Sequence, residues 1–233
     1  PSATTYTDTT AGVGSVFEYR VSKTYTTGRV PREAYVLAGN KAPLVDSRGK
    51  VILVVDATYA SDLVFELNRL KDDLEGDGWT VIRTDVSRTD SPTSVRNTIR
   101  TIYDQDPVNT SHVFLLGNVP VPQAGIRFAD GHLDHAGAWP SDTYYGDIDG
   151  VWTDTLTARN CSSGPCLAVS NRYANFPNDG KFDQSIIPSK VELAVGRVDF
   201  VDMPAFLPQN EKDLLRQYLN KDHLFRQGGM VVD

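Results

Sequence analysis

The chain has 233 residues and a formal net charge of −7 at pH 7, and 40% of its residues are hydrophobic. This length and composition are typical of a globular protein with one large core or two modest ones. The negative charge disfavours nucleic acid and anionic membranes as partners, and no apolar run approaches the roughly 20 residues that span a bilayer. Cations, neutral sugars and polypeptides are the ligand classes that remain.

The first 40 residues are predicted to form a small antiparallel β unit. Residues 4–23 alternate apolar and polar side chains on both sides of a glycine-containing turn, which indicates two antiparallel strands, and residues 32–39 suit a third. The segment resembles the last strands of a fibronectin type III module, with matches at Tyr6, Asp8, Thr9, Phe17, Tyr19, Arg20 and Val21. Because three strands are weak alone, residues 1–40 are interpreted as the remnant of such a module with a linker.

From Lys50 the hydrophobic period changes, and segments typical of strands and helices alternate. The expected order is strand 50–56, a helix from Leu63 to Leu74, strand 79–86, helix 91–105, strand 112–118 and, after a long loop, strand 190–200 and helix 209–225. This alternation predicts an α/β fold, a mainly parallel sheet with helices on both faces. The domain is predicted to span residues 41–228, and residues 229–233 to begin a following subdomain that this chain lacks.

The carboxyl ends of the strands are the usual ligand-binding edge of an open parallel sheet. Asp56 and Asp85 end the first two predicted strands, and Gly117 and Asn118 end the third. The chain contains neither the G-x-G-x-x-G nor the G-x-x-x-x-G-K-[ST] motif, which argues against nucleotide binding. Asp56 is therefore interpreted as a helix-capping or loop carboxylate.

The long loop after the third strand carries closely spaced carboxylates that predict a calcium site. The candidate ligands are Asp147, Asp149 and Asp154 around Gly150, and Asp179 and Asp183 with Asn178 in a second group. Hard cations take six to eight oxygen ligands, and neighbouring ionised carboxylates repel one another unless a cation compensates. The frame of an EF-hand is absent. The alternative interpretation is a set of solvated turn aspartates.

A further candidate metal site lies in the stretch "DGHLDH", which contains Asp130, His132, Asp134 and His135. Histidine and aspartate are both zinc ligands, and aspartate also binds calcium. No additional ligands with a recognisable spacing follow, so a polar loop is the competing interpretation. The two histidines also suit general bases, but no nucleophile is evident to pair with them.

The same loop is rich in aromatic residues, namely Trp139, Tyr144, Tyr145 and Trp152. A large loop needs an apolar core of its own, so these rings are expected to cover the sheet. The functional alternative is a platform on which sugar rings stack.

Cys161 and Cys166 are the only cysteines of the chain and flank a Ser-Ser-Gly-Pro turn. This spacing favours a small-loop disulfide over two free thiols, and no His-containing signature marks either residue as a catalytic thiol. A disulfide implies an oxidising compartment. We therefore expect a secreted or cell-surface protein.

Three segments of the chain, in their order, resemble the gingipain-like cysteine peptidases, peptidase family C25. The segments are "VFLLGN", "WPSDTYYGDIDG" and "VELAVGRVDF" with the helix that follows. The matching residues are Leu116, Gly117, Asn118, Ser141, Asp142, Tyr145, Gly146, Val195, Gly196 and Arg197. The resemblance spans about residues 50–228 and implies a caspase-like fold.

The resemblance also implies where catalysis takes place. Peptidases of this family have two consecutive caspase-like subdomains, and the second carries a His followed by Gly and a later Cys. No residue of this chain matches that pair, so the chain is expected to be the supporting first subdomain, inactive by itself. Its implied partners are the catalytic subdomain and a polypeptide substrate. The alternative is a calcium-dependent extracellular module that binds sugar or protein without catalysis.

Specific roles follow for the residues around the matched "SDTYYG" segment. Ser141 and Asp142 are expected to initiate a turn, with the Asp142 carboxylate accepting hydrogen bonds from nearby backbone amides. Tyr145 is expected to anchor the loop on the sheet, and Gly146 to let the backbone carry Asp147 and Asp149 toward one point.

Overall fold

The structure is a computed structural model, and it describes residues 6–23, 32–42, 47–127, 129, 131–132, 136–157 and 172–228. The chain divides into two compact units, Pro1–Ser47 and Arg48–Asp233. The predicted opening strand at residues 228–233 lies outside the described residues apart from Gly228. No helix within the described ranges is long and apolar enough to cross a membrane.

The described residues of the first unit include a β-hairpin, and here the predicted strand pairing was wrong. Strand β1 (Ser15–Lys23) pairs antiparallel with β2 (Arg32–Asn40), the segment that was expected to be a third strand. Residues 6–14 form no strand. The reason is local: the Asp8 carboxylate accepts hydrogen bonds from both the amide and the hydroxyl of Thr10, a turn that competes with a ladder. The fibronectin type III origin of this unit stays a prediction.

The second unit is built on a four-stranded parallel sheet in the order β4-β3-β5-β8. The strands are β3 (Gly49–Asp56), β4 (Trp79–Val86), β5 (Thr110–Leu116) and β8 (Ala194–Val198), and every neighbouring pair is parallel. The two faces of β3 bury alternate side chains, with Val51 and Leu53 on one face and Ile52 and Val54 on the other. The predicted α/β fold class is confirmed.

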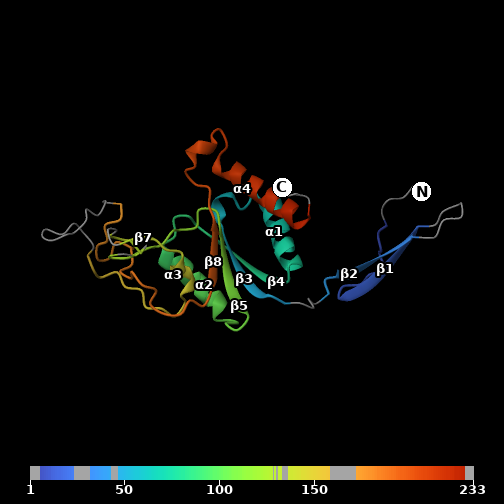
Figure 1. Ribbon diagram of the computed structural model, residues 1–233, viewed down its shortest axis with the longest axis horizontal. Coiled ribbons are helices and arrows are strands. Elements are labelled where there is room, and N and C mark those ends of the chain that lie inside the picture. The colour runs from blue at the N-terminus through green and yellow to red at the C-terminus, as the bar shows by residue number, and fades with distance from the viewer. Residues whose placement is uncertain are drawn as a thin grey trace. The chain divides into compact units, whose positions relative to one another are not determined.

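Helices α1 (Val64–Gly76) and α4 (Glu211–Arg226) cover one face of this sheet (Figure 1). Leu67 and Leu70 of α1 and Leu215 and Leu219 of α4 join the buried side chains of that face. A series of polar contacts beside these leucines joins α1 and its flanking residues to α4. The contacts are Asp62–Lys212, Glu66–Arg216, Arg69–Asn220, Asp73–His223 and Asp77–Arg226. Because the paired positions advance together along the chain, the helices run parallel.

The other face is covered by α2 (Pro92–Tyr103) and by the long loop region that follows β5 (Figure 1). Ser91 is the N-cap of α2 and Pro92 its first residue; the Ser91 hydroxyl accepts from the Ser94 amide at 3.1 Å. The described part of the loop region contains the short elements β6 (Gln123–Ala124), β7 (Trp139–Pro140) and α3 (Thr143–Gly146). Two 3-10 turns, η1 (Ala57–Tyr59) and η2 (Pro204–Phe206), follow β3 and β8.

Candidate functional site

The loop region is anchored on the sheet by the two tyrosines of α3, which are almost completely buried. The Tyr145 hydroxyl donates to the Pro120 carbonyl at 2.6 Å, and burial raises the pKa of Tyr145 far above its usual value. The Tyr144 ring stacks on Phe182 with the ring centroids 4.1 Å apart. These contacts agree with the predicted anchoring role of the aromatic residues, and they use the rings as core.

The role predicted for Asp142 is corrected by the structure. Asp142 precedes α3, but its carboxylate makes no capping hydrogen bond to the helix. Instead it accepts two hydrogen bonds of 2.8 Å from Nε and Nη2 of Arg197, in a bidentate pair. Arg197 also donates to the Val119 carbonyl at 2.6 Å. The pairing partner lies 55 residues away in β8, so no local sequence pattern revealed it.

Gly146 is required by a close approach of two backbone segments. A Cβ at this position would lie against the Leu193 carbonyl oxygen, closer than real Cβ atoms are found, and in tight contact with the side chains of Val191 and Val195. The Gly146 carbonyl accepts from the amides of Glu192 and Leu193. Glycine here therefore lets α3 pack directly on the segment that leads into β8.

Asp147 follows α3 and is completely buried. Its carboxylate accepts a hydrogen bond of 2.9 Å from the Trp152 indole and another from the Ser189 hydroxyl. The backbone beside it is held by Arg96 of α2, which donates to the carbonyls of Asp147, Ile148 and Gly150. Contacts with Trp152, Ser189 and Arg96 thus hold the turn that carries Asp147 and Asp149.

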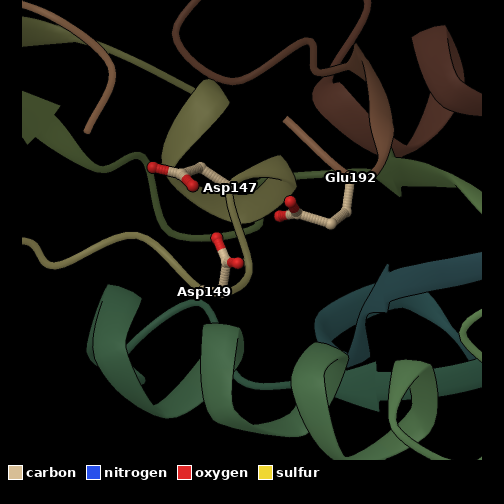
Figure 2. Close-up of side chains that lie close together, drawn as sticks. All are labelled: Asp147, Asp149 and Glu192. Carbon is tan, nitrogen blue, oxygen red and sulfur yellow. The ribbon is translucent and has the colours of Figure 1, made fainter. Parts of the chain in front are cut away.

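Asp147, Asp149 and Glu192 form a group of three carboxylates, and each has an oxygen within 4.8 Å of the others. Figure 2 shows Asp147 and Asp149 on the turn after α3 and Glu192 reaching toward that turn from a separate segment. Ser189 also donates to Asp149 at 2.7 Å, and Glu192 accepts from the Ile148 amide at 2.7 Å. The sequence predicted Asp147 and Asp149 as ligands but not Glu192, which lies more than 40 residues further along the chain.

This carboxylate group has the chemistry of a hard-cation site. Ser189 has one hydroxyl proton, which can be donated to Asp147 or to Asp149 but not fully to both. Three ionised carboxylates at this separation repel one another unless a cation compensates. Calcium takes oxygen ligands of this type, together with carbonyls and water.

The structure does not place the other three predicted calcium ligands in this group. Asp154 accepts from the amides of Asn178 and Gly180, both at 2.8 Å. Asp179 accepts from the amides of Phe176 and Lys181 within the same turn. The backbone amides therefore compensate the negative charge of both carboxylates, and neither needs a metal ion for this purpose.

Asp183 is buried and receives four hydrogen bonds, from the hydroxyl of Thr153, the amide and hydroxyl of Thr155 and the amide of Leu156. Burial alone would raise the pKa of Asp183, but these donors outweigh burial and hold the pKa below its ordinary value. Asp183 thus joins residues 153–156 to the segment that follows Phe182.

The second predicted metal group cannot be placed as a set. Of its residues, His132 is described, whereas Asp130, Asp134 and His135 lie outside the described residues. Cys161 and Cys166 also lie outside them. The zinc or calcium site at His132, Asp134 and His135 and the Cys161–Cys166 disulfide therefore stay predictions.

The carboxyl edge of the sheet holds an ion-pair network. Asp56 accepts from the Thr58 amide at 3.0 Å, which confirms its predicted role as a cap, and also pairs with Arg88 at 2.5 Å. Arg88 contacts Glu211 of α4 at 3.0 Å as well. Burial raises the pKa of Glu211, and the nearby Arg88 only partly opposes that rise. A cavity of about 580 Å³ lies beside this network, between Arg88 and the segment from Phe200 to Leu207.

The imidazoles of His112 and His223 have structural partners. The ring of His112 lies edge-on to Trp79 with centroids 4.6 Å apart, and its Nδ1 contacts the Ser111 hydroxyl at 2.8 Å. His223 pairs with Asp73 across α1 and α4 at 2.8 Å. Neither imidazole lies at the carboxyl edge of the sheet. The described part of that edge therefore carries carboxylates and a guanidinium, and no thiol–imidazole pair.

An open parallel sheet with helices on both faces and an elaborate loop region after its third strand defines an α/β protein of the caspase-like type. The family model of peptidase family C25 matches residues 44–203, more than half of the chain. The chain belongs to this family, and the resemblance to gingipain-like cysteine peptidases is confirmed. No curated protein and no solved structure matches the chain.

Proposed function

We propose that this chain is the supporting, non-catalytic half of a C25 cysteine endopeptidase, and that the catalytic His and Cys belong to an adjoining subdomain. The observation that carries this proposal is the ion-pair network at the carboxyl edge of the sheet, in which Arg88 pairs with both Asp56 and Glu211. A cysteine peptidase needs a thiolate with a histidine in hydrogen-bond reach. No histidine in the sequence is followed by glycine, so the His–Gly pair that the family resemblance implies has no counterpart.

The partners of this half are the adjoining catalytic subdomain and the polypeptide substrate. The cavity beside Arg88 supports a contact at this edge, because open parallel sheets bind their ligands beyond the carboxyl ends of the strands. An extracellular location is part of the proposal and rests on the sequence spacing of Cys161 and Cys166.

The catalytic part of the proposal is tested with casein and a reducing agent. The purified chain is expected to give no thiol-dependent cleavage, and pretreatment with iodoacetamide is expected to change nothing. Cleavage that requires reductant and disappears in Cys161→Ala or Cys166→Ala would show that this chain holds its own nucleophile. A C25 peptidase with both subdomains serves as the positive control.

The extracellular part is tested by labelling thiols under denaturing, non-reducing conditions. A Cys161–Cys166 disulfide predicts no labelled cysteine before reduction and two labelled cysteines after it. Two labelled thiols in the unreduced protein, purified from an oxidising compartment, would contradict the proposed location.

A second candidate function is a calcium-dependent binding module without catalysis, and the carboxylates of Asp147, Asp149 and Glu192 favour it. Calcium that binds only the folded state stabilises it by about 2.7 kcal/mol at a hundredfold excess over Kd. Thermal unfolding is therefore expected at a higher temperature in millimolar calcium than in EGTA.

Variants separate this site from the neighbouring turn aspartates. Asp149→Asn combined with Glu192→Gln is expected to abolish the calcium response, whereas the matched control Asp154→Asn should keep it, because Asp154 is occupied by backbone amides. An unfolding temperature that is the same in calcium and in EGTA would leave these carboxylates a purely structural role. This outcome would not affect the peptidase proposal, which the casein assay decides.

A further inference from the structure

The loop region contains a second cavity, of about 270 Å³, between the β7–α3 segment and residues 184–187. Two indoles line it, those of Trp139 and Trp152, together with the polar side chains of Ser141, Thr143 and Ser185. Ile186 and Ile187 also contribute, and Ile186 is 84% exposed. The volume is slightly below the range of about 300–1,000 Å³ for drug-sized ligands, which suits a single ring.

Both indoles are held in place by contacts outside the cavity. Trp139 stacks on Tyr173, with centroids 4.1 Å apart and an angle of 13° between the ring planes. Trp152 donates its N–H to Asp147 and lies edge-on to Tyr144 at 5.3 Å. A ligand that enters the cavity therefore meets rigid aromatic walls, and little conformational entropy is lost on binding.

The polar side of the cavity consists of uncharged groups. No charged side chain is among the described residues that line it, so the cavity favours a neutral ligand. The Ser185 hydroxyl accepts hydrogen bonds from the amides of Ile126 and Arg127 at 2.9 and 3.1 Å, which leaves its own proton for donation. Ser141 and Thr143 share one hydrogen bond of 2.7 Å, so one of their two hydroxyl protons is also left over.

We propose that this cavity binds the ring of a neutral sugar, with the apolar face of a pyranose against an indole and its hydroxyls on Ser185, Ser141 and Thr143. Hydroxyl groups both donate and accept, and this dual capacity matches the hydroxyls of a sugar. The main competing ligand for an aromatic-lined pocket is a proline ring of a polypeptide. Proline has no backbone N–H, so its backbone offers only a carbonyl acceptor. The proposal goes beyond the peptidase role and holds whether or not the chain docks on a catalytic subdomain.

The test uses the whole 233-residue chain and its intrinsic fluorescence, because the chain has three tryptophans, Trp79, Trp139 and Trp152. The methyl glycosides of glucose, galactose, mannose and N-acetylglucosamine are titrated to about 100 mM, a range that covers the millimolar affinities of single rings. A saturable change with at least one glycoside is expected. Saturation-transfer NMR should then show which face of that sugar lies against the protein.

Three variants assign the site. Trp139→Ala is expected to weaken binding at least tenfold, and Trp139→Phe, which keeps an aromatic face, to weaken it less. Trp79→Phe, in β4 and packed on His112, is the matched control and should bind as the parent does. Thr143→Ala, which keeps both indoles, is expected to weaken binding about threefold or more, and it decides the matter if Trp139→Ala fails to fold.

Three outcomes would overturn the proposal. One is the absence of a response to every glycoside. Another is a sugar response that Trp79→Phe removes and Trp139→Phe and Thr143→Ala leave unchanged. The third is saturable binding of a proline-rich peptide with no binding of sugars, which would assign the cavity to polypeptide.

Discussion

The two faces of the sheet are covered in different ways. On one face α1 and α4 bury leucines at helical spacing, and their polar contacts follow one another at regular intervals along both helices. On the other face the loop region forms an irregular layer, the loop layer, which supplies aromatic rings and buried carboxylates, including Asp147 and Asp183. Regular helices need only a periodic sequence, whereas an irregular layer needs a specific partner for each buried polar group. The candidate sites that the described residues form lie in or beside this loop layer or at the carboxyl edge of the sheet.

The largest expected effect comes from truncating the aromatic core of the loop layer. Tyr144→Ala removes a ring that is 2% exposed and stacked on Phe182, and we expect a loss of about 3–5 kcal/mol in the free energy of unfolding. Leu219→Ala on the helical face is the matched comparison, with an expected loss of about 2–5 kcal/mol. Urea unfolding followed by circular dichroism measures both. If Tyr144→Ala changes stability by under about 1 kcal/mol, the loop layer is not part of the cooperative core.

The next effect separates two glycines near the same sheet edge. Gly146→Ala places a methyl group against the Leu193 carbonyl, and overpacking of this kind costs about 1–3 kcal/mol. Gly196→Ala, in β8, meets no atom within 4 Å, so it is expected to change stability by no more than about 0.5 kcal/mol. Thermal unfolding of the two variants side by side measures this difference. Equal effects would show that the packing of α3 on the segment before β8 does not limit stability.

A third comparison concerns ion pairs of different burial. Asp142→Ala leaves Arg197, whose side chain is 15% exposed, without its bidentate partner, and we expect a loss of about 1–3 kcal/mol. Asp85→Ala breaks the Arg83–Asp85 pair, in which both side chains are more exposed, with an expected loss of at most about 1 kcal/mol. Chemical denaturation provides the measurement. A larger loss for Asp85→Ala would reverse this order and count against the anchoring role of Asp142.

The smallest effects are opposite pH dependences at two carboxyl groups. The pKa of Asp183 is lowered in the folded state, so its stabilisation is present above the ordinary pKa of about 3.9 and is lost as the pH falls through the lowered value. The deficit of Asp183→Asn should therefore grow as the pH rises from about 2 to about 5. The measurement is the melting temperature of parent and variant across this range.

Glu211 is expected to behave in the opposite way. Burial raises its pKa, so ionised Glu211 costs stability once the pH exceeds its ordinary pKa of about 4.3. Relative to the parent, Glu211→Gln should become more favourable as the pH rises from about 4 to about 7. The stabilities of the two variants relative to the parent should change in opposite directions with pH. A change in the same direction for Asp183→Asn and Glu211→Gln would contradict the opposite pKa shifts of the two carboxyl groups.

The sequence by itself determined the regular part of this protein. The apolar run of β3, the leucine spacing of α1 and the cap formed by Ser91 and Pro92 are local properties, and the structure has each element close to its predicted position. The C25 resemblance also followed from short segments in their order along the chain. The exception is the N-terminal hairpin, where the turn at Asp8 prevents a strand that the apolar alternation favoured.

Only the tertiary structure decided the pairing of the polar groups in the loop layer. It joined Asp142 to Arg197, brought Glu192 to Asp147 and Asp149, and gave Asp154 and Asp183 amide donors in place of a shared ion. A carboxylate in a loop can be satisfied by a cation, a guanidinium or a backbone amide, and these partners are chosen by contacts between segments far apart in the chain. Spacing along the sequence carries no information about that choice, because the segments meet only when the loop region folds onto the sheet.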